Sequence, residues 1–140
     1  MVINLCFLGL RTTFDTVDLQ ILKTKLYNSG IRGQAFDFVA NYLTNRKQYV
    51  ELGDFQSDVV DLTHGVPQGS ILGPLFFVIY INDLSKSCER TKCVLFADDT
   101  SIILPIFDIG CLRNELDRVD SWLKTNKLSL NTDKTKFLHF

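Results

Sequence analysis

The sequence predicts a chain that mixes helices with strands, and three stretches carry most of that prediction. The nearly unbroken apolar run from Val2 to Leu10 is typical of a strand buried on both faces. Two shorter apolar runs, Val94–Ala97 and Ile102–Leu104, flank the adjacent acids Asp98 and Asp99 and predict a hairpin with the acids in its turn. An apolar stripe at helical spacing, with Trp122 beside it, predicts an amphipathic helix through Ile109, Leu112, Leu116, Val119 and Leu123.

Three more segments carry helical signals. Asp18 is a good N-cap for a helix that stops at Gly30, and a second helix is expected from about Gln34 to Leu43. Leu75–Leu84 is apolar all round until its last residues, which predicts a helix in the centre of the core. The inward positions are Leu19, Leu22 and Leu26 in the first helix and Ala35, Phe36, Val39 and Leu43 in the second.

The remaining strand signals lie in the middle of the chain and at its end. Tyr49–Leu52 and Phe55–Leu62 predict two strands that form a hairpin near Gly53-Asp54. The turn before them contains Arg46-Lys47, which either meets phosphates or is simply a solvated basic turn. Leu128–Phe140 predicts a short strand or two.

Composition bounds the class of protein. A chain of 140 residues is expected to form one domain, residues 1–140, and 46% hydrophobic residues are typical of a folded globule. The net charge of -1 counts mildly against a function in handling nucleic acid. The four cysteines lack zinc-site spacing and predict buried thiols in a reducing, intracellular compartment. The longest apolar run, Ile71–Ile81, is about half a membrane span, so no membrane segment is expected.

The adjacent acids are the first candidate site. No Lys or Arg lies within five residues of Asp98 or Asp99, and two like charges beside buried strands are costly unless a cation neutralises them. Carboxylate oxygens suit a hard ion such as Mg²⁺. On the residues alone, a solvated Asp-Asp turn remains the alternative interpretation.

A loop dense in glycine and proline, His64–Ser70, is the second candidate site. Its glycines allow a backbone to approach a ligand closely, and Gln68 offers both a donor and an acceptor. The alternative is a helix-entry loop with Ser70 as the N-cap.

Three strings in this order resemble motifs of reverse transcriptases, with those of non-LTR, jockey-type retrotransposons the nearest in pattern. They are Phe14–Asp18, then Gly65–Ser70 with Tyr80–Leu84, then Phe96–Thr100. The tail Trp122–Phe140, with Asn131 and Lys134-Thr135, is similar to the next motif of the family. The resemblance covers nearly the whole chain. It implies an α+β fold, the palm of a right-hand polymerase, in which an antiparallel sheet with an acidic hairpin packs on helices.

The resemblance also implies roles for single residues. Asp98 and Asp99 match the catalytic pair that holds Mg²⁺, or Mn²⁺, for two-metal nucleotidyl transfer to a primer 3′-hydroxyl. Phe14 matches the aromatic gate that excludes a ribose 2′-hydroxyl. The partners implied are an RNA template, a DNA primer and a deoxynucleoside triphosphate. Gln68 and Gly69 match the loop near template and incoming nucleotide, and Lys134 matches a basic residue near the triphosphate.

Gly9 departs from the family pattern. The first catalytic aspartate of the family stands on the first strand, five residues before the gate aromatic, and Gly9 occupies that position here. Glycine offers no ligand, and Asp15 and Asp18 lie beyond the strand. The fingers that precede a palm and the thumb that follows it are also absent from the sequence, which begins and ends within predicted core elements. We therefore expect weak metal binding at most and no catalysis by this chain alone.

Two alternatives remain open. The first is a retrotransposon-derived fragment that acts only in protein or nucleic-acid binding. The second is a phosphoacceptor receiver domain, which would need a helix where Thr100–Pro105 predicts a strand. If the polymerase interpretation is right, the acidic hairpin lies beside the Val2–Leu10 strand with Gly9 near Asp98. The Leu75–Leu84 and Leu112–Leu123 helices then share one face of the sheet.

Overall fold

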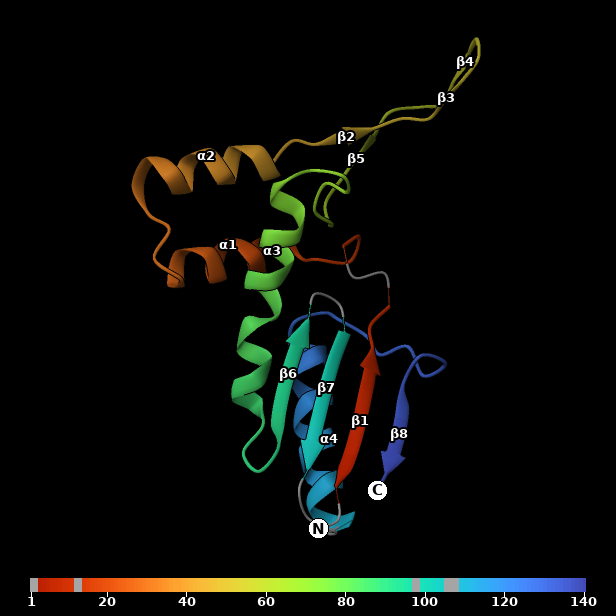
Figure 1. Cartoon of the computed structure of the whole chain (residues 1–140). Coiled ribbons are helices and arrows are strands. Elements are labelled where there is room, and N and C mark those ends of the chain that lie inside the picture. Colours follow the sequence, from red (N-terminus) through yellow and green to blue (C-terminus); the bar gives the residue numbers. More distant parts are fainter. Residues whose placement is uncertain (1–2, 12–13, 97–98, 105–108) are drawn as a thin grey trace.

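The computed structural model describes residues 3–11, 14–96, 99–104 and 109–140, and an antiparallel sheet forms its centre. Figure 1 shows the strands in the order β6-β7-β1-β8, with helix α4 (Ile109–Thr125) behind them. The strands are β1 (Asn4–Gly9), β6 (Lys92–Phe96), β7 (Asp99–Leu104) and β8 (Lys136–His139). The first strand, the hairpin of β6 with β7 and a strand near the end of the chain are therefore confirmed.

Helix α4 lies behind one face of this sheet (Figure 1). Along β1, Cys6 and Leu8 are buried, whereas Phe7 keeps 40% of its surface exposed. Cys6 lies opposite Ile102 and Leu8 opposite Thr100, and directly opposite residues of an antiparallel pair point to the same face. The prediction that the first strand is buried on both faces is wrong, because no helix of the described residues covers the second face of the sheet.

The helices begin close to where their caps predict. They are α1 (Leu19–Asn28), α2 (Gly33–Leu43), α3 (Leu72–Ile81) and α4, and α3 continues into the 3-10 helix η1 (Asn82–Ser87). Asp18 caps α1 as expected, since its carboxylate accepts the amides of Gln20 at 2.9 Å and Ile21 at 3.0 Å. No helix in the described ranges is both long and apolar enough to cross a membrane.

Two helical predictions need correction. Helix α3 begins and ends three residues before the predicted Leu75–Leu84 segment, and it does not lie in the centre of the core. Leu75 and Val78 are about half exposed, because α3 packs on α1 and η1 with one side and leaves the other open. In α2, Leu43 is buried and Ala35 is exposed, so the predicted inward face is only partly right.

A two-stranded ribbon projects from the body beyond α2 (Figure 1). It consists of the short segments β2 (Lys47–Gln48), β3 (Glu51–Leu52), β4 (Phe55–Gln56) and β5 (Val60–Asp61). Leu52 pairs with Phe55, which confirms the hairpin, and Gly53 supplies a φ of 60° in the turn. From the Gln48–Val60 pair to the Glu51–Gln56 pair, one strand advances three residues and the other four. This extra residue is a β-bulge, so the predicted long strands are broken.

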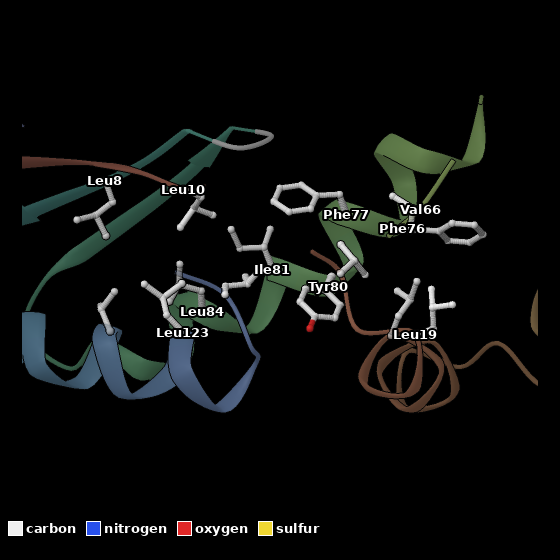
Figure 2. Packing of buried hydrophobic residues seen from close by; sticks show 14 of the residues in the cluster. Leu8, Leu10, Leu19, Val66, Phe76, Phe77, Tyr80, Ile81, Leu84 and Leu123 are labelled. Carbon is white, nitrogen blue, oxygen red and sulfur yellow. The ribbon is translucent and has the colours of Figure 1, made fainter. Parts of the chain in front are cut away.

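Apolar side chains from three layers meet beneath the sheet. Figure 2 shows the side chains of Leu8, in β1, and of Leu10, just after it, on the side of the sheet. They face Ile81 of α3, Leu84 of η1 and Leu123 of α4. The end of α3, η1 and α4 therefore share one face of the sheet, as the polymerase interpretation requires. On α4 the predicted stripe is buried at Val119 and Leu123 and partly buried at Leu112 and Leu116; the side chain of Ile109 lies outside the described residues.

Tyr80 links the helices to the end of the chain. Its buried hydroxyl donates to the carbonyl of Asn126 at 2.6 Å and accepts the amide of Asp18 at 3.4 Å. Burial raises the pKa of Tyr80 to about 12, so the hydroxyl keeps its proton. Lys25 lies against the ring and donates to the Tyr80 carbonyl and to Asp83, both at 2.6 Å.

Glu115 is the buried acid of α4, with 2% of its surface exposed. Its carboxylate accepts the amides of Glu89 and Arg90 and the hydroxyl of Thr91, at 3.0, 3.3 and 2.8 Å. Burial by itself raises the pKa of Glu115, but these hydrogen bonds and the Arg118 charge together hold it below the usual 4.5. The carboxylate thereby fixes the loop that leads into β6.

We expect Glu115→Gln to lower the free energy of unfolding by about 1–3 kcal/mol at pH 7, because charge-assisted hydrogen bonds are lost. The folded-state pKa lies below the unfolded one, so this difference is present above pH 4.5 and disappears as the pH falls through the lowered folded value. Urea unfolding at pH 7 and about pH 3 measures it. Glu51→Gln, on the exposed ribbon, is the matched control, and an equal loss in both variants would contradict the role of Glu115.

Candidate active site

The acidic turn is placed at one end of the central sheet. Asp99 is the first residue of β7, is exposed, and pairs with Phe96 of β6. Asp98 and Ala97 lie outside the described residues. Of the two predicted acids, the structure therefore places Asp99.

Gly9 lies directly opposite Asp99 in the β1–β7 ladder. Side chains of directly opposite residues start roughly 4.5–5.5 Å apart, close enough for two carboxylates to share an ion. The expected neighbourhood of Gly9 and the acidic turn is thus confirmed for Asp99. Position 9 is the position at which the resemblance predicts a further acid, and the glycine supplies none.

The turn that contains Lys134 fills the space beside Gly9. A Cβ added at Gly9 would overlap the Cβ of Lys134 and would lie 3.2 Å from its carbonyl carbon. Hydrogen bonds fix this turn: the Asn131 amide donates to the Gly9 carbonyl at 2.8 Å, and the Lys134 amide donates to the Asn131 carbonyl at 3.2 Å. Sequence reasoning placed Lys134 near the site but gave no sign that its backbone would cover Gly9.

A small cavity of about 90 Å³ joins these residues, and it is lined by Gly9, Asp99, Thr100 and Lys134 among others. The Thr100 hydroxyl is buried and, within the described part of the chain, has no hydrogen-bond partner. The structure thus brings together Asp99, the degenerate position 9 and Lys134.

The residues predicted to act as gate and loop form a second group. The ring of Phe14 packs on Phe77 with centroids 5.3 Å apart, and the Val66 amide donates to the Phe14 carbonyl at 2.8 Å. Gln68 donates from its side-chain amide to the Asp15 carboxylate at 2.7 Å. The string around Phe14 and the loop of Gln68 are therefore neighbours, although they line a different cavity from Asp99.

Local chemistry explains the shape of the glycine-rich loop. Gly65 has a φ of 84°, and a Cβ there would lie 3.0 Å from the Asp15 carbonyl oxygen, so only glycine allows this approach. Gly69 also has a positive φ, and nothing lies within 4 Å of a Cβ built on it. The Ser70 hydroxyl accepts the Gly73 amide at 2.9 Å, so Ser70 binds the first turn of α3, although the N-cap position itself is Ile71 and not the predicted Ser70.

The basic turn before the ribbon is engaged with the protein itself. Arg46 donates to the Gly65 carbonyl at 2.9 Å, and Lys47 lies 3.8 Å from Asp61 in an exposed ion pair.

Asp18 accepts the Lys127 ammonium at 2.6 Å. Burial raises the pKa of Asp18, but Lys127 and the α1 amides outweigh it and lower the pKa overall. Asp15 and Asp18 are thus both occupied elsewhere and do not replace the missing acid.

The described residues do not fit a two-metal centre. Within the described ranges, no group of three or more His, Cys, Asp or Glu side chains is placed to hold a metal ion. Asp99 stands opposite a glycine, and the Lys134 turn occupies the space of a second carboxylate on β1.

We expect Gly9→Asp to lower the free energy of unfolding by about 1–3 kcal/mol, because its Cβ overpacks against Lys134. Gly9→Asn adds a side chain of the same shape without the charge and is expected to lower the free energy of unfolding by as much. Adding Lys134→Gly removes the opposing Cβ and recovers most of the loss, whereas Lys134→Ala keeps that Cβ and recovers little. Denaturant unfolding of these variants checks the order, and equal recovery by glycine and alanine would contradict the overlap.

Comparison with known proteins identifies the family. The model of the family described as reverse transcriptase (RNA-dependent DNA polymerase) matches residues 4–139. The chain is 26% identical to the probable RNA-directed DNA polymerase from transposon X-element of Drosophila melanogaster, over 98% of this chain and 16% of that protein. It is 28% identical to the RNA-directed DNA polymerase from mobile element jockey of Drosophila funebris, over 92% of this chain and 15% of that protein. The chain therefore spans less than a fifth of the length of these relatives.

Solved structures show the same fold. Telomerase from Candida tropicalis in complex with the TWJ fragment of telomeric RNA matches with a TM-score of 0.78 and 14% identity, over 99% of this chain and 26% of that one. The apo telomerase of the same organism, truncated from its C-terminal domain, matches with a TM-score of 0.78 and 16% identity, over 99% of this chain and 31% of that one. These likenesses confirm the α+β polymerase palm. With the family model matched from β1 to β8, the chain belongs to the reverse transcriptase family, and its relatives are the polymerases of non-LTR elements that its motifs resemble.

Proposed function

We propose that this chain is the palm segment of a longer RNA-directed DNA polymerase and that it does not catalyse nucleotide addition by itself. The register of β1 with β7 carries the proposal, because it puts Gly9 opposite Asp99 at the end of the sheet. A palm presents its acids there, and here the strand next to the acidic turn presents none.

The missing carboxylate has a large expected effect. Nucleotidyl transfer by two ions requires both to be held while the 3′-hydroxyl is aligned with the phosphorus. Loss of an ion's ligand removes several kcal/mol of transition-state stabilisation, on the order of 10³-fold in rate. The Lys134 turn adds to the defect, since it leaves no room for a side chain at position 9.

Substrate contacts are proposed for the second group of residues. The Phe77 ring packs on the ring of Phe14, and the Val66 amide binds its backbone carbonyl, which suits a gate that must keep its place. Gln68 and Gly69 are exposed beside it, where a template base or an incoming nucleotide would reach them. Lys134, exposed beside Asp99, is the proposed contact of the triphosphate.

Metal binding is proposed to be weak. Asp98 and Asp99 keep two carboxylates in the acidic turn, and such a pair holds a hard ion like Mg²⁺ or Mn²⁺ mainly with help from substrate phosphates. In the longer polymerase, fingers and thumb would grip an RNA template and a DNA primer. We propose an intracellular setting, because four cysteines without zinc-site spacing are typical of buried thiols in a reducing compartment.

A second candidate function is a non-catalytic one. The Lys134 turn over Gly9 favours it, because the fold has closed the space that catalysis would need. On this alternative the palm fold serves only to bind protein or nucleic acid. Metal binding separates the two, since a module that only binds protein or nucleic acid gains no metal affinity from an acid at position 9.

Primer extension on an RNA template with Mg²⁺ or Mn²⁺ tests the proposal. We expect no extension by the unaltered chain, and none by Gly9→Asp combined with Lys134→Gly, because the 140 residues tested span less than a fifth of the length of the related polymerases. The matched control combines Gly9→Asn with Lys134→Gly. Template-dependent extension by the unaltered chain that Asp98→Asn or Asp99→Asn abolishes would overturn the proposal.

Calorimetry of metal binding supplies the second readout. Against the Gly9→Asn and Lys134→Gly control, Gly9→Asp with Lys134→Gly is expected to bind Mn²⁺ on the order of tenfold more tightly, because a carboxylate then stands opposite Asp99. Unchanged binding would show that position 9 does not belong to a metal site and would favour the non-catalytic alternative.

A further inference from the structure

The outer part of the ribbon exposes more apolar surface than a ribbon in water should. Residues 48–60, here called the distal ribbon, carry six large apolar side chains that are about half exposed or more. They are Tyr49, Val50, Leu52, Phe55, Val59 and Val60, and Leu52 and Phe55 reach 79% and 82%. A two-stranded ribbon is marginally stable alone, and clustered exposed apolar side chains mark interaction sites.

The register sorts the distal ribbon into two faces. Leu52 lies opposite Phe55, and Val50 shares the face of Leu52 because alternate residues of a strand point the same way. Glu51 points to the opposite face. Figure 1 shows the ribbon projecting from the body, so both of its long edges are open to an added strand. Between the two strands, the Ser57 hydroxyl accepts the Val50 amide at 2.8 Å in place of a backbone carbonyl.

Charge decides what kind of partner fits. The distal ribbon contains the acids Glu51, Asp54 and Asp58 and no Lys, Arg or His, a net charge of −3 in a chain whose total is −1. Like charge repels nucleic acid, whose binding relies on cations. It also disfavours pairing with a second copy of the same ribbon, and the few side chains of one ribbon offer little area for a stable dimer.

We propose that the distal ribbon docks a basic partner polypeptide, an extended segment in which apolar residues alternate with Lys or Arg. Such a segment adds as a further strand, with its backbone paired to the open edge. Its apolar side chains cover Val50, Leu52 and Phe55, and its cations face Glu51 and the acids near the turn. The site lies apart from the acidic turn and does not depend on polymerase activity.

Titration of the whole chain with a short peptide of alternating Lys and Val tests this, with an alternating Glu and Val peptide as the charge-reversed probe. We expect the Lys peptide to bind at the distal ribbon, to bind at least about tenfold more tightly than the Glu peptide, and to weaken with added salt. Chemical-shift changes in residues 48–60 locate the site. Equal binding of both peptides, or changes confined to other residues, would overturn the proposal.

Matched variants separate the two contributions. Glu51→Gln with Asp54→Asn and Asp58→Asn is expected to weaken the Lys peptide about tenfold. Neutralising the exposed Asp37, Asp117 and Asp133 should not. Leu52→Ser with Phe55→Ser is expected to abolish binding, whereas Ile71→Ser, at a side chain 95% exposed elsewhere, should leave it unchanged. All positions are on the surface, so unfolding curves should stay close to the parent. Self-association, or binding of a uridine oligonucleotide, that is lost with Leu52→Ser and Phe55→Ser would assign the surface to a second copy or to RNA instead.

Discussion

The buried hydroxyl of Tyr80 holds together the parts of the chain on which the site depends. It accepts the amide of Asp18 at the start of α1 and donates to the carbonyl of Asn126 just beyond α4. From Asn126 the chain runs directly to the segment beside Leu10, where the Arg11 amide donates to the Ser129 carbonyl at 3.0 Å, and then to the turn over Gly9. One side chain of α3 thus sets where the end of the chain returns to the sheet, and that return decides what lies beside the acidic turn.

Local signals in the sequence predicted where helices and strands form better than they predicted which side chains are buried. The Asp18 cap, the hairpin at Gly53-Asp54 and the stripe of α4 all follow from residues near one another in the chain, and the structure contains each. Burial depends on what packs against an element. An apolar helix such as α3 gives no sign of which side is covered, so Leu75 and Val78 were expected inside and lie at the surface. The outward Phe7 on β1 was missed for the same reason.

In the candidate site, too, some features could be predicted from the sequence and others could not. The string of motifs, through the family resemblance, predicted Gly9 beside the acidic hairpin and Lys134 near the triphosphate, and the structure places Gly9, Asp99 and Lys134 around one cavity. It gave no sign of Glu115 as the anchor of the loop before β6. A single acid within a helical pattern, such as Glu115, is normally predicted to be exposed to solvent. Only the fold brings two amides and a hydroxyl to its carboxylate. The hydrogen bond between Gln68 and Asp15 could likewise not be predicted from the sequence, because it joins residues far apart in the chain.

The contact between Gly9 and Lys134 constrains the order in which this sequence can change. With a glycine at position 9, the Cβ of Lys134 fits beside the first strand, because glycine has no Cβ to overlap it. Substitution of Gly9 by an acid is not equally tolerated, since its Cβ would overlap the Lys134 turn while that turn is unchanged. The two positions are epistatic. A single substitution at position 9 restores the charge but strains the fold, so the route back to an acidic first strand passes through position 134.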